Sequence, residues 1–204
     1  YGNGVYVLVG NAGVIHTTSD LATWDAKTSN TSNMLRSVVY GDDNTYVAVG
    51  NAGTIVSSVD GNTWAVQQSG VSTTLNSVTY ANAKYVAVGD AGVILTSQNG
   101  ITWAPSVSGT MNALRGVTHG NDKYVAVGDA GTILTSLDGV TWEARGSGDP
   151  DVLNGVAYGN GHYVAVGNVG TVLTSSDGVN WVTSATGSAT TNRLTDVVFG
   201  DNTF

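Results

Sequence analysis

One phrase of sequence recurs five times along this chain, and its clearest copy reads Y-V-A-V-G-D-A-G-T-I-L-T-S-L-D-G-V-T-W over residues 124–142. The copies begin at five tyrosines spaced by 40, 39, 39 and 39 residues, namely Tyr6, Tyr46, Tyr85, Tyr124 and Tyr163. Every tryptophan of the chain closes one copy. A period of about 40 residues built from short strands is typical of a β-propeller, in which each repeat forms one four-stranded blade.

Within a repeat, apolar and polar residues alternate with period two and are interrupted by Gly, Asn and Asp, which is the pattern of strands and tight turns. In the repeat that contains the phrase above, we expect strands over 114–118, 123–127, 132–135 and 141–144, with the tryptophan at the start of the outer strand. Since no segment shows helical periodicity, we expect essentially no helix.

The sequence therefore predicts one all-β domain over residues 1–204, a five-bladed propeller of four-stranded blades. The first repeat lacks an inner strand, so we expect the segment 194–199 to complete it and close the ring, which would leave no exposed sheet edge. Residues 199–204 repeat the phase of residues 1–6, so one end is redundant in such a ring. The chain could also be part of a longer array or an engineered repeat.

The turn before each tryptophan carries the most specific motif, Ser136-x-Asp138-Gly139-x-Thr141-Trp142 in the clearest copy. Asp and Ser side chains in such a turn accept hydrogen bonds from backbone amides just ahead of them, so we assign the carboxylate a structural role. One copy has Asn99 in place of Asp, and an amide oxygen can accept the same bonds. The structural positions of this motif are Asp20, Asp60, Asn99, Asp138 and Asp177, with Trp24, Trp64, Trp103, Trp142 and Trp181.

At this motif the chain resembles the Asp-box propellers, also called the bacterial neuraminidase repeat type. The whole phrase is similar to secreted or periplasmic bacterial propellers related to photosystem II assembly factors. The usual Asp-box spacing is S-x-D-x-G-x-x-W, and here the residue between Asp and Gly is missing. The resemblance covers all five repeats and implies the propeller architecture. It also suggests an extracellular or periplasmic location, although the sequence shown has no signal peptide.

The same repeat family includes sialidases, so an enzymatic role has to be considered. The resemblance implies that sialidase chemistry needs three arginines, a Tyr nucleophile assisted by a Glu, and an Asp as acid/base. This chain has four arginines and one glutamate. Glu143 and Arg145 fall on a predicted outer strand, away from a central cleft. Most aspartates occupy repeated turn positions, so we expect no enzyme.

Composition excludes several kinds of partner. The net charge is −8 and the seven basic residues are scattered, so a basic stripe for nucleic acid is absent. No apolar run approaches a membrane span of about 20 residues, and there is no cysteine. The histidines, His16, His119 and His162, stand at three different positions of the repeat, so they should not converge on a metal. We expect no metal and no cofactor.

Function is therefore sought in the residues that the repeat does not fix. The second turns, of the form Gly-x-x-Gly, and the links between blades should share one face, and variable loops on a fixed frame commonly carry binding sites. Polar side chains there change from blade to blade. The candidate ligand-binding residues are Arg36, Asn76, Arg115 and Asn154 after the inner-strand leucines, and Asn11, Asn51, Asp90, Asp129 and Asn168 in the second turns.

A ring of amide, carboxylate and guanidinium groups favours polar ligands. The main expectation is lectin-like binding of carbohydrates or other polar small molecules by a monomer. The alternative is a structural or protein-interaction scaffold, which includes an engineered or fragment-derived propeller with no evolved ligand. A glycosidase is the third and weaker interpretation. Glycans and a protein partner are both open as ligands.

Overall fold

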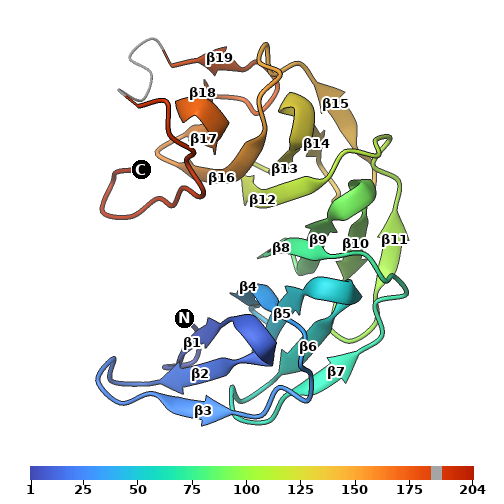
Figure 1. The fold of residues 1–204 in the computed structure, drawn as a ribbon, viewed down its shortest axis with the longest axis vertical. Coiled ribbons are helices and arrows are strands. Elements are labelled where there is room, and N and C mark those ends of the chain that lie inside the picture. The colour runs from blue at the N-terminus through green and yellow to red at the C-terminus, as the bar shows by residue number, and fades with distance from the viewer. Residues whose placement is uncertain (185–189) are drawn as a thin grey trace. The chain divides into compact units, whose positions relative to one another are not determined.

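The computed structural model describes residues 1–184 and 190–204, which form five antiparallel sheets (Figure 1). Residue contacts divide the chain into two compact units, Tyr1–Gly89 with Ile94–Pro105, and Asp90–Val93 with Ser106–Phe204. In each sheet the strands pair in chain order, with no crossover. The predicted all-β fold of repeated four-stranded sheets is confirmed for four of the five repeats.

The first unit carries three sheets. Their strands are β1 (Tyr6–Val9), β2 (Ile15–Thr18) and β3 (Asp25–Lys27); β4 (Leu35–Tyr40), β5 (Tyr46–Gly50), β6 (Ile55–Ser58) and β7 (Ala65–Gln67); and β8 (Leu75–Ala81), β9 (Lys84–Gly89), β10 (Ile94–Ser97) and β11 (Ala104–Ser106), whose last residue belongs to the second unit.

The second unit carries two sheets. They consist of β12 (Leu114–Gly120), β13 (Lys123–Gly128), β14 (Ile133–Ser136) and β15 (Glu143–Arg145), and of β16 (Leu153–Gly159), β17 (His162–Gly167), β18 (Val172–Ser175) and β19 (Val182–Thr183). The clearest repeat thus has strands close to the predicted ones, but its outer strand begins after Trp142 and not before it. The indole Nε1 of Trp142 donates to Gly139 O at 3.1 Å and holds the tryptophan in the turn.

The first sheet has only three strands among the described residues, β1, β2 and β3. The fourth strand that residues 194–199 were expected to add to this sheet stays a prediction. Residues 194–199 form no strand, although the backbone N–H of Leu194 donates to Gly167 O at 2.9 Å, as Leu35 N–H donates to Gly10 O at 2.9 Å. Closure of a ring through this segment, and a single domain over the whole chain, stay predictions.

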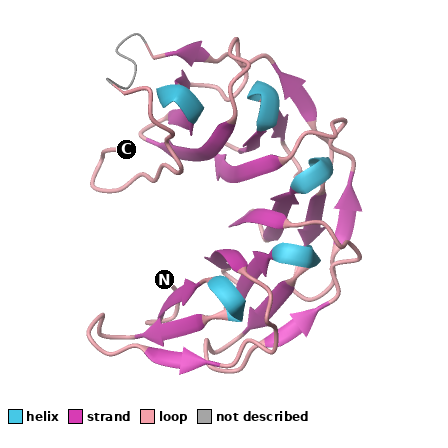
Figure 2. Ribbon diagram, in the orientation of Figure 1, coloured by secondary structure: helices cyan, strands magenta, loops and turns pink. Residues whose placement is uncertain are grey.

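The sequence predicts no helix, but each sheet contains one short 3₁₀ turn (cyan in Figure 2). It lies between β1 and β2 in the first sheet, and between the second and third strands in the other four. The bounds of these turns are Asn11–Gly13, Asn51–Gly53, Asp90–Gly92, Asp129–Gly131 and Asn168–Gly170. The middle residue of each lies in the left-handed region, with φ of 52° at Ala130 and 56° at Val169. Non-glycine residues rarely adopt this conformation, and a β-branched side chain makes it more costly.

Replacing Val169 with glycine is expected to raise the free energy of unfolding by about 1 kcal/mol, because glycine adopts positive φ without a steric penalty. The Val169 side chain is 59% exposed, so little packing is lost. Urea unfolding measures the change. The reverse substitution at the equivalent turn, Ala130→Val, should destabilise by a similar amount; equal stability of both variants and the parent would contradict the strain argument.

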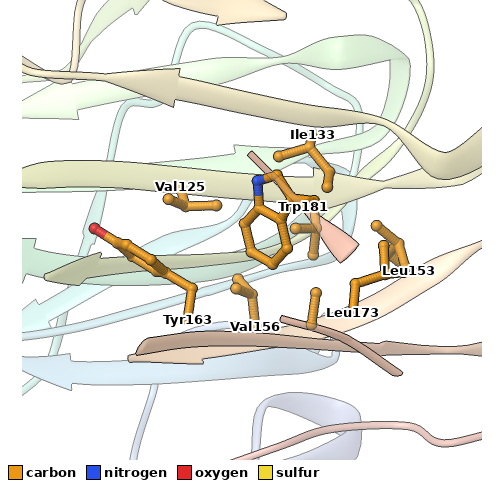
Figure 3. Close-up of a cluster of buried hydrophobic side chains, with 9 residues drawn as sticks. Val125, Ile133, Leu153, Val156, Tyr163, Leu173 and Trp181 are labelled. Carbon is orange, nitrogen blue, oxygen red and sulfur yellow. The ribbon is translucent and has the colours of Figure 1, made fainter. Parts of the chain in front are cut away.

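Within each unit, the core between neighbouring sheets is made by apolar residues of the inner three strands of the repeat and by the tryptophan. In the second unit, Trp181 packs with Val125, Ile133 and Tyr163, all at most 8% exposed (Figure 3). The alanine in the middle of the second strand is fully buried in four sheets, as at Ala126. At the equivalent place β1 has Leu8, which is 54% exposed because no inner strand covers it.

Tyrosine hydroxyls connect neighbouring sheets. Tyr163 at the start of β17 donates to Gly120 O in the hairpin between β12 and β13, and burial raises the pKa of this phenol. Tyr46 likewise donates to Gly2 O in the hairpin before β1. Tyr85 donates to Asp43 at 2.5 Å and to Thr45 O at 2.9 Å. Each hydroxyl thus joins one sheet to the first hairpin of the preceding sheet.

Candidate functional site

The hairpin motif before each tryptophan is a closed hydrogen-bond system. Asp138 Oδ1 accepts the N–H groups of Val140 at 2.8 Å and Thr141 at 2.7 Å, and Ser136 Oγ donates to the same oxygen at 3.0 Å. Asn99 Oδ1 accepts the two equivalent N–H groups at 2.9 Å each. Asp20, Asp60 and Asp177 make the same pair of bonds. This position therefore requires a side-chain oxygen that accepts hydrogen bonds, and the oxygen need not be charged.

The backbone N–H bonds to Thr141 and Val140 lower the pKa of Asp138 to about 2. Since this folded-state pKa lies below the unfolded value of about 4, the carboxylate adds stability above that pH and loses the contribution as pH falls towards about 2. The pKa of Asp177 is lowered by the equivalent bonds from Asn180 and Val179.

Replacing Asp138 with asparagine is therefore expected to change stability little at pH 7 and to flatten the loss of stability in acid. The amide oxygen keeps the acceptor role, as Asn99 does, but has no proton equilibrium in this range. Urea midpoints of variant and parent measured from pH 7 down to pH 2 test this. The variant should lose less between those limits; a parallel loss in both proteins would contradict the assignment.

The residues after the inner-strand leucines stand at β-bulges. The pairing of the first and second strands shifts by one residue at Arg36, Asn76, Arg115 and Asn154. A bulge leaves one residue unpaired in the ladder and re-aims its side chain. This feature explains why the variable polar residue can turn away from the sheet at the end of each inner strand.

In three sheets, the residue at the β-bulge contacts a residue of the second turn of the same sheet. Arg36 Nε donates to Asn51 Oδ1 at 2.7 Å, and Arg115 Nε is paired with the carboxylate of Asp129. In the last sheet Asn154 Nδ2 donates to Asn168 Oδ1 at 3.0 Å. The two sets of candidate residues predicted separately thus form pairs, and the arginines have a structural partner that the sequence did not suggest.

For the remaining candidate residues, the structure describes their positions in the repeat but gives no distance for such a pair. Asn11 is exposed in the first turn. Asn76 lies at the bulge of β8, and Asp90 begins the 3₁₀ turn after β9; both are half-buried and have interaction partners. The binding role of all nine candidate residues stays a prediction.

In the second unit the bulge residues lie beside one another on neighbouring inner strands. A Cβ on Gly116, the residue after Arg115, would lie 3.2 Å from Gly155 Cα, so β12 and β16 approach closely at this end. Arg193 Nη2 donates to Asn154 Oδ1 at 3.2 Å, and Asn154 Nδ2 also donates to Leu194 O at 2.7 Å. Arg193, which precedes the last inner-strand leucine, was not among the residues predicted from the sequence.

The links between sheets contact the same turns, as the sequence predicted for one face. Asp129 N–H donates to Ala113 O at 2.9 Å, and Asn168 N–H donates to Val152 O at 2.9 Å. Gly131 N–H donates to Asp151 O at 2.9 Å. The fifth link, 183–193, lies partly outside the described residues.

Among residues 1–184 and 190–204, no group of three or more His, Asp or Glu side chains is placed to hold a metal ion. Within the same ranges, no helix is long and apolar enough to span a membrane.

No protein-family model matches the chain, and no curated protein matches it. The chain is similar in structure to YCF48 bound to D1 peptide, with a TM-score of 0.65 and 19% identity, over 86% of this chain and 61% of that one. A chain of the nidogen/laminin complex matches with a TM-score of 0.70 and 13% identity, over 97% of this chain and 83% of that one. YCF48 from Cyanidioschyzon merolae matches with a TM-score of 0.50 and 16% identity, over 90% and 82%.

These likenesses and the five repeated sheets show that the fold is a β-propeller. The chain spans 61% of the length of the YCF48 chain in its peptide-bound structure. The structural likenesses agree with the propeller fold that the sequence resemblance implies. The narrower Asp-box assignment stays a prediction.

Proposed function

We propose that the protein is a non-catalytic binding module that takes an extended protein or peptide segment carrying a carboxylate, at the bulge ends of its inner strands. This is the protein-interaction alternative of the sequence analysis, and the observation that supports it is the way Arg36 and Arg115 are held. Two structural neighbours are YCF48 bound to a D1 peptide and a chain of the nidogen/laminin complex, and binding of a peptide or protein by such propellers supports this role.

Each of these arginines is fixed by its inner nitrogen. Nε of Arg36 is bound by Asn51 and Nε of Arg115 by Asp129, whereas the terminal nitrogens of both have no partner among the described residues. The side chain of Arg115 is 36% exposed. A guanidinium with its Nε edge fixed and its terminal fork open is suited to bidentate binding of a carboxylate, and it loses little side-chain entropy on binding.

The neighbourhood of Arg115 suits a peptide better than a sugar. Arg193 adds a second cation at the neighbouring sheet, where its Nη2 is held by the Oδ1 of Asn154, which is buried and 7% exposed. Two guanidinium groups suit a carboxylate-bearing peptide better than a neutral sugar. None of the nine candidate side chains is aromatic, so the stacking surface that lectins commonly offer to sugar rings is missing from this set. Carbohydrate binding is therefore the second candidate.

Catalysis is not part of the proposal. The only glutamate, Glu143, lies on the outer strand β15 and is paired with Arg145, and the repeated turn carboxylates accept backbone N–H groups. We place the protein outside the cytoplasm, because charged residues make up only 11% of its composition. Nucleic acid is not a proposed partner.

Two arrays, one of peptides and one of glycans, test the proposal. The peptide array contains acidic sequences with free C-termini, and the same sequences with amidated C-termini and neutral side chains. We expect binding to carboxylate-bearing peptides, and Arg115→Ala should weaken it at least about tenfold in fluorescence anisotropy. Lys27→Ala, which removes a basic residue from the outer strand β3, is the control and should bind as the parent does. Binding to glycans alone would favour the lectin; unchanged peptide binding by Arg115→Ala would overturn the site.

A further inference from the structure

A hollow of about 240 Å³ lies over one face of the sheet formed by β13, β14 and β15, and its lining includes none of the bulge residues. The residues that matter for its chemistry are Lys123, Thr135, Leu137, Asp138, Glu143 and Arg145. All of them belong to the second unit.

Strand register places a cation and a carboxylate on opposite sides of this hollow. Thr135 is paired with Val125 on one side and with Glu143 on the other, so these three residues share a face of the sheet. Lys123, two residues before Val125, shares that face as well, because side chains alternate along a strand. Two strand spacings, about 10 Å, separate the β13 and β15 backbones.

The charges differ in how far they are already satisfied. Arg145 is held by Nε, which donates to the Thr135 hydroxyl at 2.8 Å, and by an ion pair with Glu143. Thr135 is only 3% exposed, so this anchor is fixed in the sheet. The Glu143 side chain is 66% exposed. Among the described residues the Lys123 ammonium is in no ion pair.

The repeat itself does not require these charges. The positions equivalent to Glu143 hold Ala65, Ala104 and Val182 in three other sheets, and those equivalent to Arg145 hold Gln67, Ser106 and Ser184. The first sheet has an acid and base there, Asp25 and Lys27, but Val5 stands where Lys123 stands. The full set of charges occurs in the fourth repeat alone, so the repeated fold does not depend on it.

We propose that this hollow binds a zwitterion whose ammonium and carboxylate are several carbons apart, such as a C-terminal lysine of a peptide or a free ω-amino acid. The ligand carboxylate would lie at Lys123 on β13 and the ammonium at Glu143 on β15. A simple anion would meet the two carboxylates, and a simple cation would meet Lys123 and Arg145, so each is disfavoured relative to a ligand that carries both charges.

The test is an NMR titration of the full chain with ε-aminocaproate, and with caproate and hexylamine as probes of the same length that carry one charge each. We expect ε-aminocaproate to bind with a Kd on the order of 1 mM, with amide shifts confined to residues of β13 to β15 and the turn after β14. Glycine, in which the two charges are adjacent, should bind more weakly.

Variants locate the site. Lys123→Ala and Glu143→Gln should each weaken ε-aminocaproate binding about fivefold, whereas Lys84→Ala, at the equivalent position of the third sheet, should leave it unchanged. Arg115→Ala should also leave it unchanged, which separates this site from the proposed peptide site. Equal binding of caproate or hexylamine, unchanged binding by Lys123→Ala, or no shift at all would overturn the proposal.

Discussion

Replacing Trp64 with alanine is expected to lower the free energy of unfolding by about 4 kcal/mol, the largest loss among the single substitutions considered for this chain. Its indole is 1% exposed and packs in a cluster with Ile15, Leu35 and Tyr46, whose ring centroid lies 6.1 Å away. The indole Nε1 also donates to Gly61 O at 3.0 Å. Alanine would leave a cavity and an unpaired carbonyl in the same place.

The matched control is Trp24, which holds the same position of the repeat but is 37% exposed. Trp24→Ala should lower the free energy of unfolding by about 1 kcal/mol, because folding buries less apolar area of Trp24 than of Trp64. Urea unfolding followed by tyrosine and tryptophan fluorescence measures both. If the two variants lost equal stability, the tryptophan would act through the turn motif that all repeats share and not through burial.

Replacing Gly120 with alanine is expected to destabilise by about 3 kcal/mol through overpacking. A Cβ at this position would lie 2.1 Å from Cδ1 of the Tyr158 ring, which closes the inner strand of the next sheet. The glycine is required for this close approach, and the flat ring cannot retreat without breaking its 4.6 Å centroid contact with Tyr163. Thermal unfolding should show a clearly lowered midpoint.

Two further variants separate the clash from a general effect of losing glycine. Gly146→Ala lies in a link where an added Cβ has nothing within 4 Å, and it should be near neutral. In the double variant Gly120→Ala/Tyr158→Ala the second change removes the clash, so the two losses should fall short of additivity by more than about 1 kcal/mol. Additive losses would show that the ring is not what Gly120 avoids.

The sequence predicted the strands well because the same pattern is repeated five times, and comparison of the copies separates the recurring apolar residues from chance. The bulges at Arg36 and Arg115 could not be predicted, since an offset of one residue between two strands arises from backbone pairing and leaves no signature in composition. The 3₁₀ turns were missed for a related reason: alanine at positive φ, as at Ala130, is disfavoured by its own chemistry and is imposed by the surrounding fold.

The candidate site was predicted as two sets of residues and is described as pairs. Arg115 and Asp129 are 14 residues apart and Arg36 and Asn51 are 15 apart, so the spacing is nearly the same in both repeats and the pairing could in principle have been predicted. What no spacing reveals is which nitrogen of the guanidinium is used. That detail decides whether the arginine is a structural residue or still has an open edge for a ligand.

The described hydrogen bonds of the tyrosine hydroxyls between sheets run in the same direction along the chain. Tyr163 secures the hairpin that ends at Lys123, in the preceding sheet, but β12 to β15 supply no equivalent bond in return to the hairpin of β16 and β17 among the bonds described. Within each unit, support therefore runs from one sheet back to the sheet before it. Amide hydrogen exchange should spread unevenly from a local opening: loss of β17 frees the hairpin at Gly120, whereas fraying of that hairpin leaves β17 protected.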